Sequence, residues 1–143
     1  MFIIFEGFDK TGKTTLIKEL LKRTKYKHIV WDRGPVSQYV FDLIFDREPD
    51  DQLWQTAKIL SSMKNLVVLC EADSDIIKQR LIEANEDLPK ELEDIDTVKA
   101  VFRLYTNVLG FNKLILDTTN KSIDECVEVI VKAIEEIEND RSL

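Results

Sequence analysis

The sequence predicts an α/β fold in which helices cover both faces of a parallel sheet. Along the chain, short apolar runs alternate with segments whose apolar residues recur at helical spacing. The runs are continuously apolar, which is typical of parallel strands that are buried on both faces. A glycine-containing turn joins the first run to the first helical segment. Because strands and helices alternate, right-handed crossovers and a parallel sheet are expected.

Each expected element can be placed by its local pattern. Strands are expected over residues 2–5, 29–31, 65–71 and 113–117. Helices are expected over residues 13–24, 36–45, 51–63, 74–85, 95–109 and 123–139. Ser122 and Glu125 form a capping-box pattern at the start of the last helix, and Gly110 is suited to end the helix before it. Asp50 or Asp51 can cap the third helix.

The composition indicates one globular domain. The chain has 143 residues, of which 44% are hydrophobic and 33% charged. We expect a single domain over residues 1–143 with a short acidic, lid-like segment near residues 85–95. No apolar run is long enough to span a bilayer and the first residues do not resemble a signal peptide, so we expect a cytoplasmic protein without a membrane partner. Cys70 and Cys126 are expected to be buried free thiols.

The overall charge limits the classes of ligand. The formal net charge is −7, with a pI near 4.8. This argues against a large nucleic-acid footprint, because such footprints need a basic face. A few placed cations and backbone amides can still hold a small anion. The sequence leaves the oligomeric state open, a homodimer included.

The turn at residues 7–14 carries the strongest functional signal. It fits the phosphate-binding pattern G-x-x-x-x-G-K-[ST] and lies between a predicted strand and a predicted helix. In this pattern the lysine, Lys13, reaches the β- and γ-phosphates, and the hydroxyl of Thr14 can bind Mg²⁺. The turn therefore predicts a P-loop NTPase fold, with ATP and Mg²⁺ as cofactors. The predicted nucleotide-binding residues are Gly7, Thr11, Gly12, Lys13, Thr14 and Thr15.

A second polar pair, Asp32 and Arg33, follows the second predicted strand. In open parallel sheets, ligands bind beyond the carboxyl ends of the strands, so this pair is expected beside the P-loop. Asp32 can hold Mg²⁺ or accept a proton from the acceptor, and Arg33 can donate two hydrogen bonds to an acceptor phosphate. The alternative is a surface turn with a weak ion pair, which the neighbouring P-loop makes less attractive.

Together these segments resemble the thymidylate kinase family of nucleoside monophosphate kinases. Residues 5–15 are similar to its opening F-E-G-x-D-[RG]-x-G-K-[ST]-[ST], and residues 32–41 to its segment D-R-x-x-x-S-x-x-[AV]-[YF]. The likeness covers most of the chain and is closest to the compact members carried by phages and prophages. It implies ATP-dependent phosphoryl transfer to a (deoxy)nucleoside monophosphate, as part of nucleotide biosynthesis.

The resemblance also implies roles for individual residues. Asp9 would bind the 3′-hydroxyl of the acceptor sugar and Arg33 its phosphate, while Arg80 falls at the position of the arginine that precedes the lid. The implied acceptor-binding residues are Asp9, Arg33, Ser37 and Tyr39. The implied residues of the adenine-side loop are Asp117, Thr118 and Thr119.

The chain departs from that family in two places. The segment between Thr14 and Arg33 is too short for the additional strand and helices that read the base, so the sheet should have four strands in the order 2-1-3-4 and the base is not predicted. Aromatic side chains that could replace the missing wall of the base pocket are Tyr39, Phe41, Phe45 and Trp54. The lid-like segment also lacks arginine. Lys10 occupies the family's P-loop arginine position and is expected to supply the missing cation beside the transferred phosphoryl group.

Two other interpretations remain open. The chain could be a polynucleotide 5′-kinase or a small-molecule kinase, in which an aspartate also follows the P-loop closely. It could also be a degenerate regulatory module that binds a nucleotide without transferring a phosphoryl group. The acidic charge weakens the polynucleotide version. The missing lid cations and base pocket favour the regulatory module, whereas the intact Asp9, Lys13, Thr14, Asp32 and Arg33 oppose it.

Overall fold

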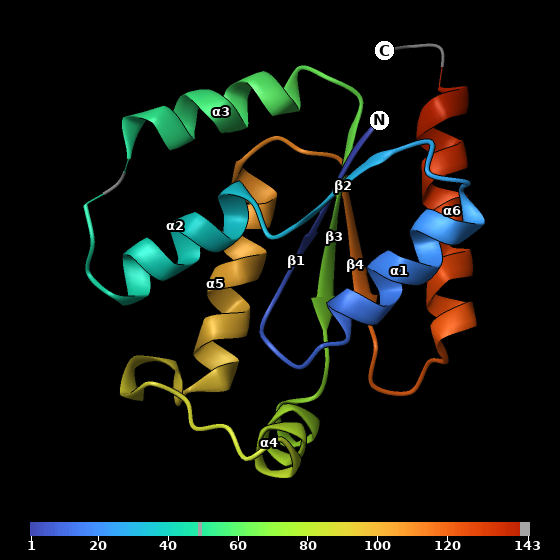
Figure 1. The fold of residues 1–143 in the computed structure, drawn as a ribbon. Helices are drawn as coiled ribbons and strands as arrows, with labels where there is room; N and C mark the ends of the chain where they lie inside the picture. Colours follow the sequence, from blue (N-terminus) through green and yellow to red (C-terminus); the bar gives the residue numbers. More distant parts are fainter. Residues whose placement is uncertain (49, 141–143) are drawn as a thin grey trace.

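The computed structural model describes residues 1–48 and 50–140, in which strands and helices alternate (Figure 1). The strands are β1 (Phe2–Glu6), β2 (Ile29–Asp32), β3 (Asn65–Glu71) and β4 (Lys113–Asp117). The helices are α1 (Lys13–Arg23), α2 (Pro35–Ile44), α3 (Asp51–Ser61), α4 (Ser74–Glu83), α5 (Ile95–Val108) and α6 (Ile123–Asn139), with a short 3₁₀ helix, η1 (Lys90–Leu92). This alternation confirms the predicted α/β fold.

The four strands form one parallel sheet in the order β2-β1-β3-β4, as predicted. Phe5 is aligned with Asp32 on one side and Val68 on the other, and Glu71 is aligned with Asp117. Because all strands run in the same direction, their carboxyl ends meet at one edge of the sheet. The loops that follow β1, β2 and β4 therefore lie at this common edge.

Alternating side chains of the sheet enter two separate cores. On β1, Ile4 belongs to the core with residues of α2 and α5, whereas Ile3 and Phe5 belong to the core with residues of α1 and α6. Figure 1 shows α2 and α5 on one side of the sheet and α1 and α6 on the other. The sheet is thus the middle layer of a three-layer α/β/α arrangement, which confirms the predicted layers.

Local capping signals set the ends of several helices. The capping box of Ser122 and Glu125 is formed at the start of α6, and Asp50 accepts a hydrogen bond from the backbone N–H of Gln52 at the start of α3. Gly110 follows α5 with a φ of 74°. The acidic segment predicted as a loop differs in detail, because it contains η1. Leu92 of η1 is buried in the core of α2 and α5, which holds this turn against the protein.

Both cysteines are buried free thiols, as predicted. Cys70 and Cys126 lie in the core that includes α1 and α6. Burial raises the pKa of Cys70 to about 12, so its thiol stays protonated at neutral pH. In the part of the chain that the structure describes, no helix has the length and apolar character needed to cross a membrane.

Candidate active site

The loop after β1 has an unusual backbone that exposes the start of α1. Gly7, Lys10 and Gly12 have φ values of 128°, 65° and 88°. A Cβ atom at Gly7 would lie 2.2 Å from the carbonyl oxygen of Cys70, so only glycine fits there. Helix α1 has no side-chain cap and no acidic residue in its first turn. Its first N–H groups and the positive end of its dipole are therefore available to an anion.

Lys13, the first residue of α1, is held inside this loop by neutral groups. Its Nζ donates to the carbonyl oxygens of Phe8 at 2.8 Å and Gly7 at 3.1 Å. The residue is only 7% exposed, and burial lowers the pKa of Lys13 while Cys70, Asp32 and Glu6 act to raise it. Because carbonyls rather than a carboxylate hold the ammonium group, its charge remains free to attract a phosphate.

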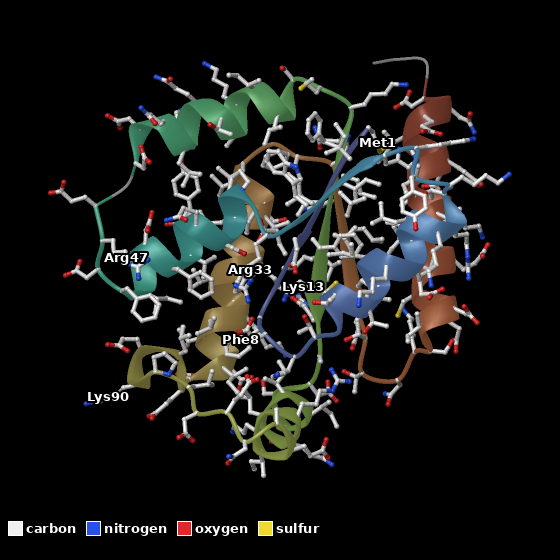
Figure 2. All side chains as sticks on the ribbon, viewed as in Figure 1. Met1, Phe8, Lys13, Arg33, Arg47 and Lys90 are labelled. Atoms are coloured by element: carbon white, nitrogen blue, oxygen red, sulfur yellow. The ribbon has the colours of Figure 1, made fainter. Side chains whose placement is uncertain are left out.

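A cavity of about 530 Å³ opens over the loop and brings together most of the predicted catalytic residues. Its lining residues are Asp9, Lys10, Gly12, Lys13, Thr14, Thr15, Asp32, Arg33 and Glu86. Figure 2 shows Lys13 and Arg33 at the same end of the sheet, near Phe8. The side chains of Thr14 and Asp32 belong to exposed residues and so can reach a ligand. Donor-side and acceptor-side candidates thus share one cavity.

Arg33 and Asp9, the two residues implied to bind the acceptor, form an ion pair with each other. Arg33 has a φ of 68°, and its backbone N–H donates to the carbonyl oxygen of Phe5 at 2.8 Å. Its guanidinium carbon also lies 5.3 Å from the centroid of the Phe41 ring. These contacts fix the guanidinium group at the edge of the cavity, where its donors can meet an anionic ligand.

A buried carboxylate that the sequence did not reveal, Glu6, holds the turn after β2. It is fully buried and accepts hydrogen bonds from the N–H of Gly34 at 2.7 Å, from the N–H of Ser37 at 3.0 Å, and from the Ser37 hydroxyl. Helix α2 has no side-chain cap of its own, so Glu6 caps it from β1. Burial raises the pKa of Glu6 to about 7, although these hydrogen bonds and Arg33 act to lower it.

The two other residues implied to bind the acceptor lie on α2 in different surroundings. Ser37 is 4% exposed and its hydroxyl donates to Glu6. Tyr39 stacks on Tyr105 with ring centroids 5.5 Å apart and packs against the core of α2 and α5. The described lining of the 530 Å³ cavity includes neither residue. Ser37 is thus placed to orient Glu6, and its binding role and that of Tyr39 stay predictions.

Lys10 lies at the cavity with an acidic partner from the lid-like segment. Its Nζ is 2.9 Å from a carboxylate oxygen of Glu86, and its carbonyl oxygen accepts a hydrogen bond from Arg80 at 2.6 Å. Lys90 of the same segment lies at the periphery, away from Lys13 (Figure 2). The segment therefore contributes a carboxylate to the cavity.

A second cavity, of about 360 Å³, lies on the β4 side of the loop. Its lining includes Thr118 and Lys121 together with Thr15 and Arg80. The hydroxyl of Thr118 donates to the carbonyl oxygen of Thr11 at 2.8 Å, which ties the end of β4 to the P-loop. This cavity is large and apolar enough in its lining to receive an aromatic ring next to the phosphate-binding loop.

The other two residues of the predicted adenine-side loop support its shape. The carboxylate of Asp117 accepts a hydrogen bond from the N–H of Thr119 at 2.9 Å. Hydrogen bonding by the side chain and then the backbone of Thr119 lowers the pKa of Asp117. The hydroxyl of Thr119 accepts a hydrogen bond from the N–H of Asp73 at 2.8 Å. The structure thus gives Asp117 and Thr119 partners within the protein.

A second interaction that the sequence did not reveal joins α5 to the end of β3. Arg103 donates two hydrogen bonds of 2.6 Å to the carboxylate of Glu71, which raises the pKa of Arg103. The two residues are far apart in sequence and belong to no common motif. This pairing engages the guanidinium group of Arg103. The cations that line the two cavities beside the P-loop are Lys10, Lys13, Arg33, Arg80 and Lys121.

Comparison with solved structures shows the fold to which this site belongs. No family model matches the sequence, and no curated protein matches it. The YorR protein from Bacillus subtilis, solved in complex with phosphorylated GDP, is 23% identical, with a TM-score of 0.80 over 99% of each chain. Deoxyadenosine kinase from M. mycoides, solved with dCMP and a flexible dCDP, is 15% identical, with a TM-score of 0.65 over 96% of this chain and 100% of that one.

These likenesses define the class of the fold. At such low identities they establish the architecture, a P-loop α/β/α arrangement that this chain shares along nearly its whole length. The architecture agrees with the parallel sheet and the loop that encloses Lys13. What the chain does with this fold depends on the residues of its own cavities.

Proposed function

We propose that this chain transfers the γ-phosphoryl group of ATP to the phosphate of a (deoxy)nucleoside monophosphate. The observation that carries the proposal is the 530 Å³ cavity, which holds the P-loop lysine, Lys13, together with the acceptor-side pair of Asp9 and Arg33. A kinase needs cations for two anionic partners in one space, and this cavity provides them. The nucleotide ligands of the YorR protein and of deoxyadenosine kinase are consistent with this assignment.

ATP fits the side of the site built by β1 and α1. Its phosphates would meet the uncapped N-terminus of α1 and the ammonium group of Lys13. Its adenine would enter the cavity beside Thr118 and Lys121. The residues assigned to ATP are Gly7, Thr11, Gly12, Lys13, Thr14, Thr15, Asp117, Thr118 and Thr119.

The same cavity has oxygen ligands suited to Mg²⁺. The hydroxyl of Thr14 and the carboxylate of Asp32 belong to exposed residues that line it, and oxygen donors are the ligands that Mg²⁺ prefers. Bound there, Mg²⁺ would neutralise charge on the β- and γ-phosphates. Asp32 would also receive a proton from the acceptor.

On the acceptor side, Arg33 would exchange its bond to Asp9 for the phosphate of the monophosphate, and Asp9 would then accept from the 3′-hydroxyl of the sugar. An oxygen of that phosphate forms a bond to the γ-phosphorus while the bond from the γ-phosphorus to the bridging oxygen breaks, which releases ADP. Lys10, which lines the cavity, and Arg80, which donates to the carbonyl oxygen of Lys10, would offset the charge on the transferred group. Residues 1–143 would act as one catalytic domain, with the segment near residues 85–95 as its lid.

A panel of acceptors tests the proposal. The protein would be incubated with Mg²⁺ and ATP plus each deoxynucleoside monophosphate, each nucleoside, shikimate as a small-molecule acceptor, or a 5′-hydroxyl oligonucleotide, and products would be separated by ion-exchange chromatography. We expect diphosphates from monophosphates, with poor turnover of acceptors that lack the 3′-hydroxyl and no turnover by Lys13→Ala. Phosphorylation of another acceptor alone would contradict the assignment.

A second candidate, a regulatory module that only binds nucleotide, is favoured by one observation. The lid-like segment brings the carboxylate of Glu86 to the cavity, where many kinases place an arginine. The same panel separates the two functions, because a regulatory module would bind ATP with no turnover of any acceptor.

A further inference from the structure

A third cavity, of about 360 Å³, adjoins Arg33 on the α2 side of the site. Its walls come from the end of β2, from α2 and from α3, and the side chains that matter here are Trp31, Arg33, Gln38, Phe41, Leu53 and Thr56. Arg33 lines both this cavity and the 530 Å³ cavity. A ligand whose phosphate contacts Arg33 can therefore extend from one cavity into the other.

We propose that this third cavity holds the base of the acceptor nucleotide, that Trp31 and Phe41 form its apolar walls, and that Gln38 selects bases with an exocyclic amino group. This inference rests on the proposed function, because it takes Arg33 to be the acceptor-phosphate residue. It names a base class that the motifs in the sequence leave open.

The aromatic walls are held in place by their neighbours. Trp31 lies on the edge strand β2 and is 38% exposed, while Phe2 packs edge-on against it with ring centroids 5.6 Å apart. Phe41 is partly buried in the core of α2 and α5 and lies under the guanidinium group of Arg33. Flat aromatic bases stack favourably on such rings and on guanidinium planes.

The polar group of the cavity has a fixed orientation. The Nε2 atom of Gln38 donates to a carboxylate oxygen of Asp42 at 2.9 Å, and Asp42 is only 5% exposed. This bond engages the nitrogen of the Gln38 amide, so the Oε1 atom is the part of the amide that is left to accept a hydrogen bond from a ligand. The hydroxyl of Thr56 donates to the carbonyl oxygen of Gln52 at 2.9 Å, which leaves its lone pairs as acceptors as well.

This arrangement of acceptors favours one class of base. Adenine, guanine and cytosine carry an exocyclic amino group that can donate to the Oε1 atom of Gln38. Thymine carries carbonyl oxygens on both sides of its single N–H, and these oxygens would lie against acceptors. Unpaired polar atoms in a binding site are costly, so dTMP should bind more weakly than dAMP, dGMP or dCMP.

Tryptophan fluorescence gives a direct binding test. The chain has two tryptophans, and Trp54→Phe leaves Trp31 as the single reporter. Trp54 lines a different cavity, between α3 and the end of α5. We expect saturable quenching of Trp31 by dAMP, dGMP or dCMP, with an affinity at least fivefold above that of dTMP. Deoxyribose 5-phosphate, which has the sugar and phosphate without the base, should leave the emission of Trp31 unchanged. In the second control, Trp31→Phe with Trp54 intact, the monophosphates should leave the emission of Trp54 unchanged.

Kinetics with a matched control test the selecting residue. Trp31→Ala should raise the acceptor KM at least tenfold with the ATP KM within twofold, and Gln38→Ala should reduce the preference over dTMP to less than twofold. The control is Gln79→Ala on α4, because Gln79 likewise donates to an acid four residues later, at 3.2 Å from Glu83, but lies outside the described cavities. This control should behave as wild type.

The outcomes separate this inference from the proposed function. The base cavity would be overturned if monophosphates were turned over while the fluorescence of Trp31 did not respond to them and Trp31→Ala left the acceptor KM unchanged. That result would leave the kinase assignment intact. Tighter binding of dTMP than of the amino-bearing nucleotides would overturn the role of Gln38. Quenching of Trp31 by monophosphates without any turnover would support the cavity and contradict the proposed function.

Discussion

The two halves of the 530 Å³ cavity are built by different physical means. The donor half is one continuous loop, in which Gly7 and Gly12 set the backbone and Lys13 is held by carbonyl oxygens within six residues of it. The acceptor half joins distant residues, because Arg33 pairs with Asp9 and its turn is held by Glu6 of another strand. The donor half is therefore a local property of the sequence, whereas the acceptor half is a property of tertiary packing.

The halves also differ in how their cations are kept. Lys13 rests on neutral groups and can turn to a phosphate without losing an ion pair. Arg33 must exchange one anion for another, which makes its affinity for a ligand the difference between two charged interactions. We therefore expect the donor half to be the less tolerant of substitution.

The largest effect is expected at Lys13. Lys13→Ala should lower kcat at least 100-fold, about 2.7 kcal/mol in the barrier, because the main cation at the donor phosphates is lost. Thr14→Ala should give a similar loss through the Mg²⁺ site. Steady-state assays with a urea unfolding curve would check this, with Lys18→Ala on the exposed side of α1 as the control. Wild-type turnover by Lys13→Ala would show that the loop has another role.

Glu6 should make the acceptor half sensitive to pH. Its pKa is about 7 in the folded protein against 4.5 for the free side chain, so the folded state binds its proton more tightly. The stability associated with this proton is present below about pH 4.5 and is lost as the pH rises through 7. Ionisation of Glu6 therefore lowers the free energy of unfolding by about 3 kcal/mol.

Glu6→Gln removes this titration and provides the measurement. The free energy of unfolding of Glu6→Gln relative to wild type should rise by up to about 3 kcal/mol between pH 4.5 and pH 8, as followed by urea unfolding. Comparing the two proteins cancels the titration of the other carboxylates. A difference that stays constant across this range would contradict the burial-driven shift.

A smaller effect is expected at Lys10. Lys10→Ala should lower kcat about tenfold, about 1.4 kcal/mol, with little change in ATP affinity, because its charge acts on the transferred group. Lys10→Arg should preserve or raise kcat. Lys90→Ala is the control, since Lys90 lies at the periphery (Figure 2). Unchanged kcat in Lys10→Ala would strengthen the regulatory interpretation.

The smallest effect is expected at Glu86. Glu86→Gln should raise kcat less than about threefold, because the exposed ion pair between Glu86 and Lys10 contributes little and its loss frees Lys10 for the phosphoryl group. Rates at low and high salt provide the check, since added salt should raise the wild-type rate towards that of the variant. A fall in kcat would instead indicate that Glu86 positions Lys10.

The same contrast explains what could be predicted from the sequence. The helix caps at Asp50 and Ser122 and the loop around Lys13 depend on local signals, and the structure has them where they were expected. The sheet order was expected from the family resemblance and not from a local signal, and it is also observed. Glu6 ends β1 and precedes the P-loop glycine, so the sequence shows it only as part of a motif. Its hydrogen bonds with Gly34 and Ser37 form only when β1 and α2 are packed together.

The rest of the site depended on contacts with no sequence signal. Arg103 meets Glu71 across α5 and β3, and Trp31 joins a cavity only because β2 is an edge strand beside α2 and α3. Tyr39, whose role at the acceptor stays a prediction, stacks on Tyr105 and packs against the core of α2 and α5, a contact that the sequence does not signal. Helical spacing predicts that a residue faces inwards without saying which cavity it reaches.

The division of the cavity into donor and acceptor halves is tested most directly by calorimetric titration of two variants with two ligands. Wild type, Arg33→Ala and Lys13→Ala would each be titrated with a non-hydrolysable ATP analogue in Mg²⁺ and with the preferred monophosphate. We predict that Arg33→Ala weakens binding of the monophosphate at least tenfold and changes the affinity for the ATP analogue by less than twofold. Lys13→Ala should weaken binding of the ATP analogue at least tenfold and change the affinity for the monophosphate by less than twofold. Equal losses for both ligands in Arg33→Ala would contradict the assignment of Arg33 to the acceptor.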